Sequence, residues 1–494
     1  MNSGKKISKS LNTLLQKINL PSYIKETLVY GLSLDTRNIR KDEIFFALKG
    51  QNFDGNNYID DAIKKGALIV LSDNPNLENN RQVFYYPDLL KEIANISSIF
   101  YDHPSQKLDI FCATGTNGKT SFVESLSQIS QNLGIKCGFV STISTSVGKQ
   151  ELVDSILTTP NSINLNRVLS ESLSNNCKIA AIEASSHGIV QKRLEGIKIK
   201  VAVLTSFSQD HLDYHKTIAA YEAAKQSFFF DNDIESSLIN IDSDFGARLY
   251  TSLKLSKKLV YSISIHKESD FKISFTRKNL QNIYVTIDSP FGSINFYVNT
   301  FSKMMASNVA IAVASFLITG VPLDVLANKI QDVFLPKGRM ELVKINKNSY
   351  CIIDFAHTPE ALSKSILEIK QSFSGKLWCI FGCGGDRDQK KRSLMGKIAE
   401  DFSDFVVLTN DNPRFESPKA IIANILEGME KPELVFIQED RYKAINFCLK
   451  KIISQKDPIN LLIAGKGHED FQLVNGSSIN FNDKKVVLNL LNNS

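Results

Sequence analysis

A glycine-rich segment at residues 113–120 places the strongest constraint on the fold of this chain. It reads ATGTNGKT, follows the apolar run 109–113 and precedes a helical pattern. A buried strand that turns through glycines directly into a helix is typical of α/β folds with a mostly parallel sheet. The spacing is that of a P-loop, with Ala113 in place of the first glycine. We therefore predict an α/β fold that carries this loop at the carboxyl end of a strand.

The composition of the loop is typical of phosphate binding. Because Gly115 and Gly118 lack side chains, backbone N–H groups can converge on phosphate oxygens, and the dipole of the following helix favours an anion. We expect Lys119 to reach the β- and γ-phosphates of a nucleotide and Thr120 to ligate magnesium. A glycine turn that happens to carry a lysine is the structural alternative. The predicted ATP-binding loop comprises Gly115, Thr116, Asn117, Gly118, Lys119, Thr120 and Ser121.

Apolar runs and helical patterns alternate along the rest of the chain and divide it into three domains. Strands are expected at 44–48 and 67–71 around a helix at about 58–65, then at 109–113, 179–183, 200–205 and 236–241, and finally at 351–354, 377–381, 405–409, 434–437 and 460–464. Residues 271–298 alternate apolar with polar side chains, which predicts an antiparallel meander, and a helix follows from about 304 to 318. We expect a small N-terminal α/β domain at 1–103, a central P-loop ATPase-type domain at 104–336 whose mostly parallel sheet includes the meander, and a C-terminal Rossmann-like α/β domain at 337–494.

Composition excludes several classes of protein. Lysine plus arginine total 58 against 52 acidic residues, which leaves a net charge of +6 over 494 residues. This balance is too mild to indicate nucleic acid as a partner, and no stretch reaches 18 apolar residues, so we expect no membrane insertion. The seven cysteines lack a zinc spacing and are interpreted as reduced core residues, and the first residues lack the apolar core of a signal peptide. We expect a cytoplasmic monomer that acts on anionic small molecules.

Two polar residues that follow buried strands are candidate partners of Thr120 in a magnesium site. Glu183 ends the apolar run 179–183, and His211 lies just past the strand expected at 200–205. Both would lie at the carboxyl edge of the sheet, where the P-loop also lies. Glu183 as a helix cap and His211 as a partner of a loop carbonyl are the alternatives, but the P-loop favours the metal site.

Other motifs of the chain resemble those of the Mur ligase family. Its central part carries EASSHG at 183–188, QKR at 191–193, DHLDYH at 210–215 and YEAAK at 221–225. The last third carries GRME at 338–341, DFAHTP at 354–359, FGCGGDRD at 381–388 and GKGHED at 465–470. With LDTR at 34–37 and FALKG at 46–50, the matches run in order through nearly the whole chain. They look most like the family member that adds the third amino acid of the peptidoglycan stem peptide.

The resemblance implies an ATP-dependent amide ligase of peptidoglycan precursor synthesis. ATP would phosphorylate the side-chain carboxylate of D-glutamate in UDP-N-acetylmuramoyl-L-Ala-D-Glu, and an incoming amine would displace phosphate from the acyl phosphate. Such chemistry needs charge neutralisation more than a protein nucleophile. The implied catalytic residues are Lys119, Glu183, His211 and Lys225. Lys225 resembles the family lysine that carbon dioxide carbamylates and that holds a second magnesium, although YEAAK alone would indicate a helix-surface lysine.

The same resemblance assigns residues to each ligand. The implied metal ligands are Thr120, Glu183, His211 and Lys225 as N6-carboxylysine, with Mg²⁺ as cofactor. The UDP-substrate residues are Ser33, Thr158, Thr159, Ser185, Gln191 and Arg193. Besides the P-loop, ATP would contact Asn308, Arg339, Asp354 and His357. Members commonly carry asparagine where this chain has Ser206 and Met305, which leaves open, at those two positions, contacts to adenine or to the groups around magnesium.

DNPR at 411–414 indicates which amino acid is added, because this form resembles that of members that accept meso-diaminopimelate. The implied binding residues are Arg387, Asp411, Asn412, Pro413, Arg414, Gly465 and Glu469. Diaminopimelate has a distal carboxylate that L-lysine lacks; arginine can pair with this group, and the acidic side chains can accept from the distal ammonium. A proline turn with a structural ion pair is the alternative for this motif.

Several other functions stay open at this point. The same reaction with L-lysine, the ligase that adds D-alanyl-D-alanine and folylpolyglutamate synthetase share the architecture, although DNPR followed by GKGHED argues against the last two. A nucleic-acid-stimulated ATPase would need basic stripes with aromatic residues, which the mild charge does not indicate. A nucleotide-binding scaffold without catalysis would require Lys225 and His211 to be dispensable.

Overall fold

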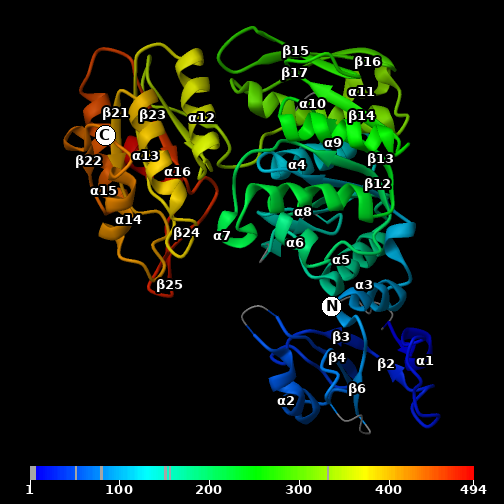
Figure 1. Cartoon of the computed structure of the whole chain (residues 1–494). Helices are drawn as coiled ribbons and strands as arrows, with labels where there is room; N and C mark the ends of the chain where they lie inside the picture. Colours follow the sequence, from blue (N-terminus) through cyan, green and yellow to red (C-terminus); the bar gives the residue numbers. More distant parts are fainter. Residues whose placement is uncertain are drawn as a thin grey trace.

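The computed structural model describes residues 7–50, 53–77, 82–149, 153–154, 157–330 and 333–493. Three α/β domains, each built around its own sheet, are seen in Figure 1, which confirms the predicted fold class. In this view the C-terminal domain lies beside the central domain, and the N-terminal domain lies below it. Residues 1–6 and 494, which the predicted domains 1–103 and 337–494 include, lie outside the described residues.

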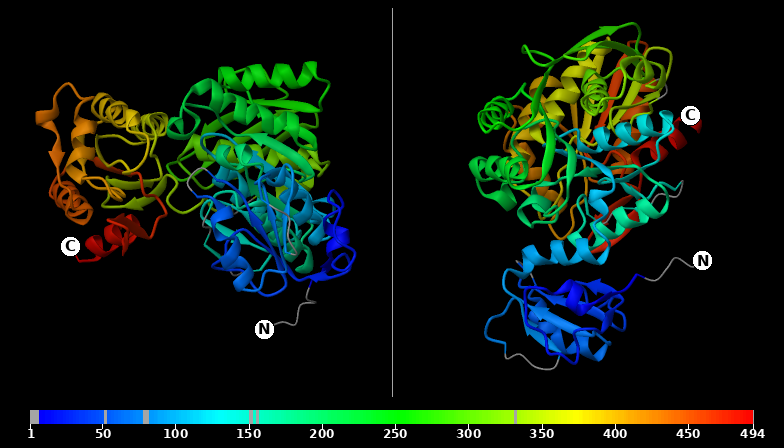
Figure 2. Two further views of the ribbon diagram at one scale, coloured as in Figure 1. Left: turned by 60° about the horizontal axis from the view of Figure 1, so that its bottom comes forward. Right: turned by 90° about the vertical axis from the view of Figure 1, so that its right-hand side faces the viewer.

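The N-terminal domain contains a four-stranded parallel sheet. Its strands are β3 (Gly31–Ser33), β4 (Glu43–Ala47), β5 (Ile69–Ser72) and β6 (Val83–Tyr85), and helix α2 (Ile59–Lys64) lies between β4 and β5 in the chain. A small strand pair, β1 (Lys9–Ser10) and β2 (Leu28–Val29), lies beside helix α1 (Leu11–Leu14). Helix α3 (Leu89–Phe100) lies between this sheet and the central domain (Figure 2). It packs against α5 (Ser162–Ser174) of the central domain, and Ile163 of α5 joins the N-terminal core.

The central domain is an 11-stranded mixed sheet in the order β10-β9-β8-β11-β7-β12-β13-β14-β15-β16-β17. The strands from β8 to β15 run parallel: β8 (Cys137–Val140), β11 (Ile179–Glu183), β7 (Asp109–Thr114), β12 (Ile199–Leu204), β13 (Ile234–Asn240), β14 (Val260–Ser264) and β15 (Phe271–Arg277). The predicted meander is confirmed, because β16 (Ile283–Ser289) pairs antiparallel with β15 and β17 (Gly292–Val298). At the other edge, β9 (Ser144–Ser146) and β10 (Val153–Asp154) are antiparallel. The sequence prediction missed β8 and β14, whose short runs contain polar residues or glycine.

Helices cover both faces of this sheet because its strands are apolar on both sides. Along β7, Phe111 and Ala113 pack on the face covered by α4 (Lys119–Asn132) and α10 (Lys303–Ile318). Ile110 and Cys112 pack on the other face, which is covered by α5, α8 (Ile218–Asp231) and α9 (Asp244–Leu255). The other helices in the described part of this domain are α6 (Ser186–Val190), α7 (Leu212–His215) and α11 (Leu323–Lys329).

The C-terminal domain has a six-stranded sheet in the order β18-β19-β23-β20-β21-β22. Its strands are β18 (Glu341–Lys344), β19 (Tyr350–Asp354), β23 (Ile459–Ala464), β20 (Lys376–Phe381), β21 (Phe405–Leu408) and β22 (Phe436–Ile437), and all but β18 are parallel. Helices α12 (Pro359–Ser372), α13 (Lys390–Phe402), α14 (Pro418–Leu426), α15 (Arg441–Ile453) and α16 (Asp483–Asn492) accompany it, and β24 (Phe471–Val474) and β25 (Ser477–Asn480) form a hairpin. The strand predicted at 434–437 is wrong in its first half, since Pro432 begins a 3-10 turn that ends at Leu434.

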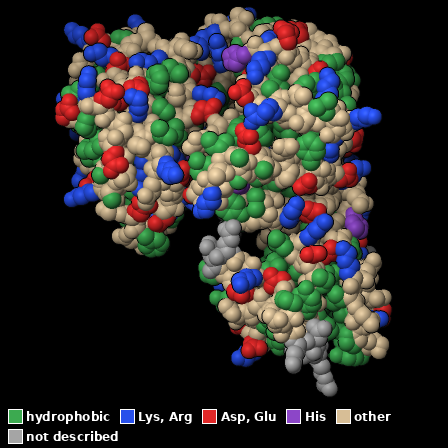
Figure 3. Space-filling view, in the orientation of Figure 1, with side chains coloured by type: hydrophobic (Ala, Val, Ile, Leu, Met, Phe, Trp, Pro, Cys, Tyr) green, Lys and Arg blue, Asp and Glu red, His purple; other side chains and the backbone are tan. Residues whose placement is uncertain are grey.

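Several predictions about composition can be compared with the structure. All seven cysteines are buried and free, as predicted. Within the described residues, no helix combines the length and the apolar character that crossing a bilayer requires. Basic and acidic side chains are interspersed over the face drawn in Figure 3, in keeping with the mild net charge.

Candidate functional site

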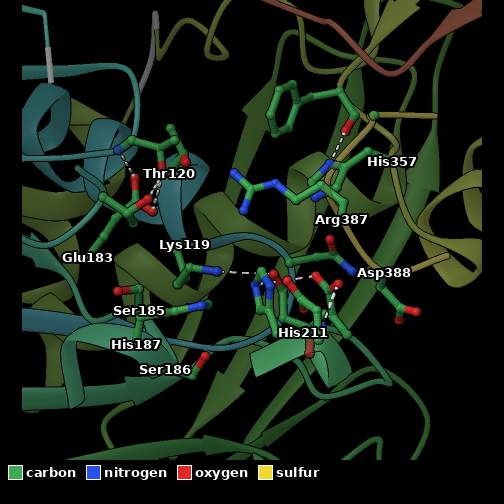
Figure 4. A pocket seen from close by; sticks show the side chains of 18 of the residues that line it. Lys119, Thr120, Glu183, Ser185, Ser186, His187, His211, His357, Arg387 and Asp388 are labelled. Atoms are coloured by element: carbon green, nitrogen blue, oxygen red, sulfur yellow. Dashed lines mark hydrogen bonds and ion pairs between the residues drawn. The ribbon is translucent and has the colours of Figure 1, made fainter. Parts of the chain in front are cut away.

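A cavity of about 530 Å³ lies where loops at the carboxyl ends of the central and C-terminal strands meet. Parallel α/β sheets bind ligands at this edge. The residues predicted from the sequence that line the cavity are Gly115, Thr116, Asn117, Gly118, Lys119, Thr120, Thr158, Glu183, Ser185, Gln191, Arg193, His211, Lys225, Arg339, His357, Arg387, Asp411, Asn412, Arg414, Gly465 and Glu469. In Figure 4, Glu183 lies beside Thr120 on one side of the cavity, with His357, Arg387 and Asp388 on the other.

Six predicted residues, all within the described ranges, are not among those that line this cavity: Ser33, Ser121, Thr159, Asn308, Asp354 and Pro413. Ser33 lies in the N-terminal domain, where its hydroxyl donates to the carbonyl of Asp35 at 3.0 Å. Thr159 is fully buried and donates to the carbonyl of Glu183 at 2.7 Å, so it supports the strand end that carries Glu183.

The P-loop begins helix α4 through a glycine that no other residue replaces without strain. Gly118 has a φ of +89°, and a Cβ atom there would lie 2.5 Å from Oδ1 of Asn308. The next residue, Lys119, donates from Nζ to the carbonyls of Gly115 (2.8 Å) and Thr116 (3.0 Å). Burial lowers the pKa of Lys119. The loop thus places a lysine and the N-terminus of a 14-residue helix at the cavity, which suits a phosphate group.

Ser206 has a defined role in holding the P-loop. Its hydroxyl accepts from the backbone N–H of Asn117 at 2.9 Å and donates to the carbonyl of the same residue at 3.0 Å. Thr205 donates to that carbonyl at 2.6 Å, and Thr116 donates to the carbonyl of Ser208 at 2.9 Å. The loop after β12 therefore fixes the backbone of the P-loop.

Glu183 and Thr120 both line the cavity at the carboxyl end of the central sheet. Glu183 is fully buried, and its carboxylate accepts from the backbone N–H of Thr142 at 2.7 Å and from the hydroxyl of Thr142 at 3.0 Å. Thr120 is 3% exposed and lies in the first turn of α4. The sequence contains no motif that marks Thr142, which lies just past the end of β8.

His211 lies in a cluster of aromatic side chains beside Asp210. It has a φ of +56°, and its Nε2 atom lies 3.5 Å from Oδ2 of Asp210. Its ring centroid is 5.1 Å from that of His187 and 6.2 Å from that of Tyr221. Burial lowers the pKa of His211 to about 3, so the imidazole is neutral near pH 7 and keeps a lone pair.

Lys225 is a buried amine, not a surface lysine. It is 1% exposed on α8, its Nζ atom lies 3.4 Å from the hydroxyl of Thr114, and the same atom lies 4.6 Å from the centroid of the Tyr221 ring. Burial, followed by the positive charge of Lys119, lowers the pKa of Lys225 well below its ordinary value. A neutral amine at this position is a nucleophile.

The predicted nucleotide residues outside the P-loop differ in their surroundings. Buried Nδ2 of Asn308 and buried Nε of Arg339 each lack a hydrogen-bond partner among the described residues. Arg339 lines the cavity, and Asn308 packs against Gly118 of the P-loop. Arg339 also lies over the ring of Phe355, 4.5 Å from its centroid. Asp354 instead accepts from the N–H of Met340 at 3.0 Å and from the hydroxyl of Ser365 at 2.6 Å, so it holds the segment next to Arg339.

Two further side-chain contacts lie near the P-loop and near Phe355. The hydroxyl of Ser121 donates to the sulfur of Met305 at 3.7 Å, so the second departure from the family pattern packs against the P-loop helix. Nδ1 of His357 lies 2.8 Å from the carbonyl of Phe355, and burial lowers the pKa of this histidine to about 4. His357 is therefore neutral near pH 7.

Arg193 anchors the side of the cavity formed by the central domain. Its guanidinium donates to Oε1 of Gln191 through Nε at 3.1 Å and through Nη2 at 2.6 Å, and Nη1 donates to the carbonyl of Thr159. Burial lowers its pKa. Ser185 accepts from the N–H of Gly188 at 3.1 Å as the cap of α6. The two motifs EASSHG and QKR thus form one wall.

The C-terminal domain supplies two arginines and two carboxylates to the opposite wall. Arg414, at a φ of +53°, donates from Nη1 to the carbonyl of Gly385 at 2.7 Å. Burial, followed by the positive charge of Arg387, lowers the pKa of Arg414. Burial raises the pKa of Asp411, which is 8% exposed, and Glu469 lines the cavity next to it. This wall can bind a group that carries both a carboxylate and an ammonium.

Some cavity residues were not assigned roles from the sequence. His187, Asp210, Asp213 and Tyr221 line the cavity and lie within motifs that had been recognised, so the motifs were the available signal. Cys383 and Asp388 also line it and lie within the motif FGCGGDRD. Lys391 and Thr142 line it from outside these motifs, and their participation depends on how distant loops meet.

The residues at the P-loop fit magnesium only together with phosphate oxygens. Among the described residues, no three or more histidine, cysteine, aspartate or glutamate side chains are grouped as a metal site. Magnesium usually takes one or two carboxylates plus substrate phosphates and water. The hydroxyl of Thr120 and the carboxylate of Glu183 fit that pattern. The neutral imidazole of His211 would add a nitrogen ligand, and carbamylation of Lys225 would add a second carboxylate-like group.

Comparisons with known proteins agree along the whole chain. Residues 28–104 match the model "Mur ligase family, catalytic domain", residues 113–316 match "Mur ligase middle domain" and residues 338–467 match "Mur ligase, glutamate ligase domain". The chain is 33% identical over 497 residues to the UDP-N-acetylmuramoyl-L-alanyl-D-glutamate--2,6-diaminopimelate ligase of Haemophilus influenzae (strain PittEE), covering 97% of this chain and 100% of that protein. It is 36% identical to the Rickettsia typhi protein of the same name, covering 95% of each. A solved structure of a ligase with this name has a TM-score of 0.69 and 28% identity, covering 98% of this chain and 99% of that one.

Proposed function

The chain belongs to the Mur ligase family, and from that premise we propose that it ligates meso-diaminopimelate to UDP-N-acetylmuramoyl-L-Ala-D-Glu. ATP is the cosubstrate, and the bond formed is the amide between the D-glutamate side-chain carboxyl and an amine of the amino acid. The two curated relatives carry this activity in their names. The product belongs to peptidoglycan precursor synthesis.

Each domain has one task in this proposal. Residues 1–103 bind the UDP end of the substrate through Ser33 and its neighbours. Residues 104–336 bind ATP and the dipeptide end, and residues 337–494 bind the incoming amino acid. The shared cavity supports this division, because its lining comes from the central and C-terminal domains together.

The side chains of the cavity suit phosphoryl and acyl transfer. Lys119 and the first N–H groups of α4 stabilise the negative charge of the phosphates, and Asn308 and Arg339 donate to the nucleotide through their unpartnered atoms. Arg193 and Gln191 orient the UDP substrate so that its D-glutamate carboxylate meets the γ-phosphate. The amine that attacks the acyl phosphate must be neutral, and the loss of its proton accompanies formation of the amide.

Thr120, Glu183, His211 and carbamylated Lys225 would hold Mg²⁺, which supplies positive charge to the phosphates during transfer. Carbamylation forms a bond between Nζ of Lys225 and the carbon of carbon dioxide, and the nitrogen loses a proton. The reaction needs a neutral amine, and the lowered pKa of the buried Lys225 favours it.

The proximity of Arg387 and Arg414 carries the choice of diaminopimelate over L-lysine. Burial, followed by the positive charge of Arg387, lowers the pKa of Arg414. A carboxylate between the two guanidinium groups would relieve their repulsion. Diaminopimelate has such a carboxylate at its distal end. L-lysine lacks it and would leave the donors without a partner.

The release of phosphate, measured with the UDP substrate, ATP and Mg²⁺, tests the proposal. Phosphate release should require all three together with meso-diaminopimelate. The value of kcat/KM should fall at least tenfold when L-lysine replaces diaminopimelate. Equal or faster turnover with L-lysine would reject the proposed amino acid while leaving the family assignment intact. Activity with D-alanyl-D-alanine in place of either amino acid would reject the proposed step altogether.

A further inference from the structure

Lys466 is a fully buried cation in the loop that follows β23, and the reaction as described above does not use it. It lies between Gly465, with a φ of +110°, and Gly467, with a φ of +53°. A Cβ atom on Gly467 would lie 2.6 Å from the carbonyl oxygen of Gly338, so the loop is tightly packed. These two turns direct the Lys466 side chain into the C-terminal domain.

The ammonium of Lys466 is bound by two residues that line the cavity. Nζ lies 2.7 Å from Oε2 of Glu469 and donates to Oδ1 of Asn412 at 3.2 Å. The same atom lies 5.9 Å from the centroid of the Phe471 ring. The lysine thus joins the loop after β21, which carries Asn412, to the loop after β23, which carries Glu469.

These contacts leave Asn412 in a single orientation. Its Oδ1 atom accepts from Lys466 and from the backbone N–H of Leu473 at 2.9 Å, so the amide cannot exchange its oxygen and nitrogen without losing both bonds. Its Nδ2 atom then donates to Oε2 of Glu469 at 2.8 Å. Oε2 of Glu469 therefore receives two donors, one from Lys466 and one from Asn412.

The other oxygen of Glu469, Oε1, has no hydrogen-bond partner among the residues that the structure describes. Glu469 is 21% exposed and lines the cavity, so Oε1 is the atom left to accept from a ligand. The charges fit the same conclusion. Glu469 pairs with Lys466 at 2.7 Å and the buried Asp411 lies beside them, so an ammonium that binds Oε1 is attracted by both acidic side chains.

We propose that Lys466 is a positioning residue for recognition of the incoming amino acid, because it holds Glu469 and Asn412 so that one carboxylate oxygen receives the distal ammonium of the substrate. The proposal rests on the proposed function, since it assumes that the C-terminal wall binds a diamino acid. Lys466 acts through Glu469 and Asn412 and does not itself touch the substrate.

A double-mutant cycle separates this role from a purely structural one. The variants are Lys466→Met, Glu469→Gln and the double variant, each assayed for the KM of the amino acid, ATP and the UDP substrate. We expect Lys466→Met to raise the KM of the amino acid at least tenfold and to change the KM of ATP less than twofold. In the Glu469→Gln background, Lys466→Met should raise that KM by less than threefold, because the group it positions is already altered.

Lys485→Met is the matched control. Lys485, on α16, forms an ion pair of 2.9 Å with Asp470, which belongs to the same loop as Lys466. Lys485 is exposed and is not one of the residues that line the cavity. Its replacement should leave all three KM values within twofold of the wild type. If Lys466→Met does not yield folded protein, Lys466→Arg, which keeps the positive charge but not the position of the ammonium, replaces it in the cycle with the same expected results.

Three results would overturn the proposal: an unchanged or lower KM of the amino acid in Lys466→Met, equal increases in the KM of ATP, or full additivity in the cycle. The cycle is measured with whichever of meso-diaminopimelate and L-lysine the wild type ligates faster. A wild-type preference for L-lysine would therefore reject the proposed substrate without removing the test of Lys466.

Discussion

Replacement of Gly118 by alanine tests whether the backbone of the P-loop depends on one contact with α10. At the φ of +89° an alanine costs about 1–2 kcal/mol, because its Cβ atom approaches the neighbouring carbonyl. The same Cβ atom would lie 2.5 Å from Oδ1 of Asn308, and relief of such overpacking costs about 1–3 kcal/mol more. We expect Gly118→Ala to lose about 2–5 kcal/mol of folding free energy in total.

Gly134→Ala supplies the control on the same helix. Gly134 follows the other end of α4 with a φ of +75°, and its Cβ atom would meet nothing within 4 Å. Only the backbone cost of about 1–2 kcal/mol applies there. A loss of 1 kcal/mol lowers the midpoint of thermal unfolding of a domain of this size by about 2–4 °C. Gly134→Ala should therefore lower this midpoint by a few degrees, and Gly118→Ala should lower it by about twice as much or more.

The kinetic consequence distinguishes the two glycines more sharply. Asn308 must move to admit the new methyl group of Gly118→Ala, and it carries the unpartnered Nδ2 atom that faces the nucleotide in our proposal. We expect the KM of ATP, from phosphate release, to rise at least tenfold, or about 1.4 kcal/mol, in Gly118→Ala and to stay unchanged in Gly134→Ala. Equal midpoints together with equal KM values for the two variants would refute the reasoning.

Three further predictions concern the amino acid, the pH and the domain contact. Arg414→Ala should lower kcat/KM for meso-diaminopimelate by about 10- to 100-fold, the worth of a charged hydrogen bond, and leave kcat/KM for L-lysine within threefold; equal losses for both substrates would contradict the assignment. Burial lowers the pKa of His215 to about 4 in the folded protein, against about 6.5 in the unfolded chain. Between these two pH values the unfolded chain binds more protons than the folded protein does, so thermal stability should fall as the pH is lowered from about 6.5 to about 4. His215→Phe should flatten the dependence and His266→Gln should not; an unchanged slope in His215→Phe would argue against this origin. Glu368, on α12 of the C-terminal domain, accepts from the hydroxyl of Ser302 at 2.7 Å and from the N–H of Met304 at 3.3 Å, at the start of α10 of the central domain. Glu368→Ala should therefore weaken the contact between these two domains and increase the radius of gyration measured by X-ray scattering. A radius identical to that of the wild type would contradict this role.

The parts of the site whose geometry is local can be placed from the sequence. Gly118, Lys119 and Thr120 act through neighbouring backbone atoms at the start of one helix, so their spacing carries their arrangement. The placement of Glu183 followed from one further rule, because parallel strands bring their carboxyl ends to one edge. The motifs of the C-terminal domain follow β19, β20, β21 and β23 and meet for the same reason.

Other roles depend on contacts between segments far apart in the chain. Lys225 belongs to a segment that indicates a surface helix, and only the packing of α8 against the sheet buries its amine and lowers its pKa. Asp354 is predicted to contact the nucleotide, and only the fold shows that its carboxylate also accepts from Met340 and Ser365. The bonds of Ser206 to Asn117 were likewise not predictable, because a hydroxyl has no local pattern that names its partner.

The sequence by itself therefore determined the α/β class, the three domains, the P-loop and the family, since these rest on residue type, spacing and order along one chain. The tertiary structure decided which side chains share the cavity, which donors remain unpartnered, and which charges balance one another. Lys466 illustrates the difference: the motif GKGHED contains it, but only the folded loops bring it to 2.7 Å from Glu469 and 3.2 Å from Asn412. Burial and pairing depend on distances across the fold, and no spacing along the chain contains them.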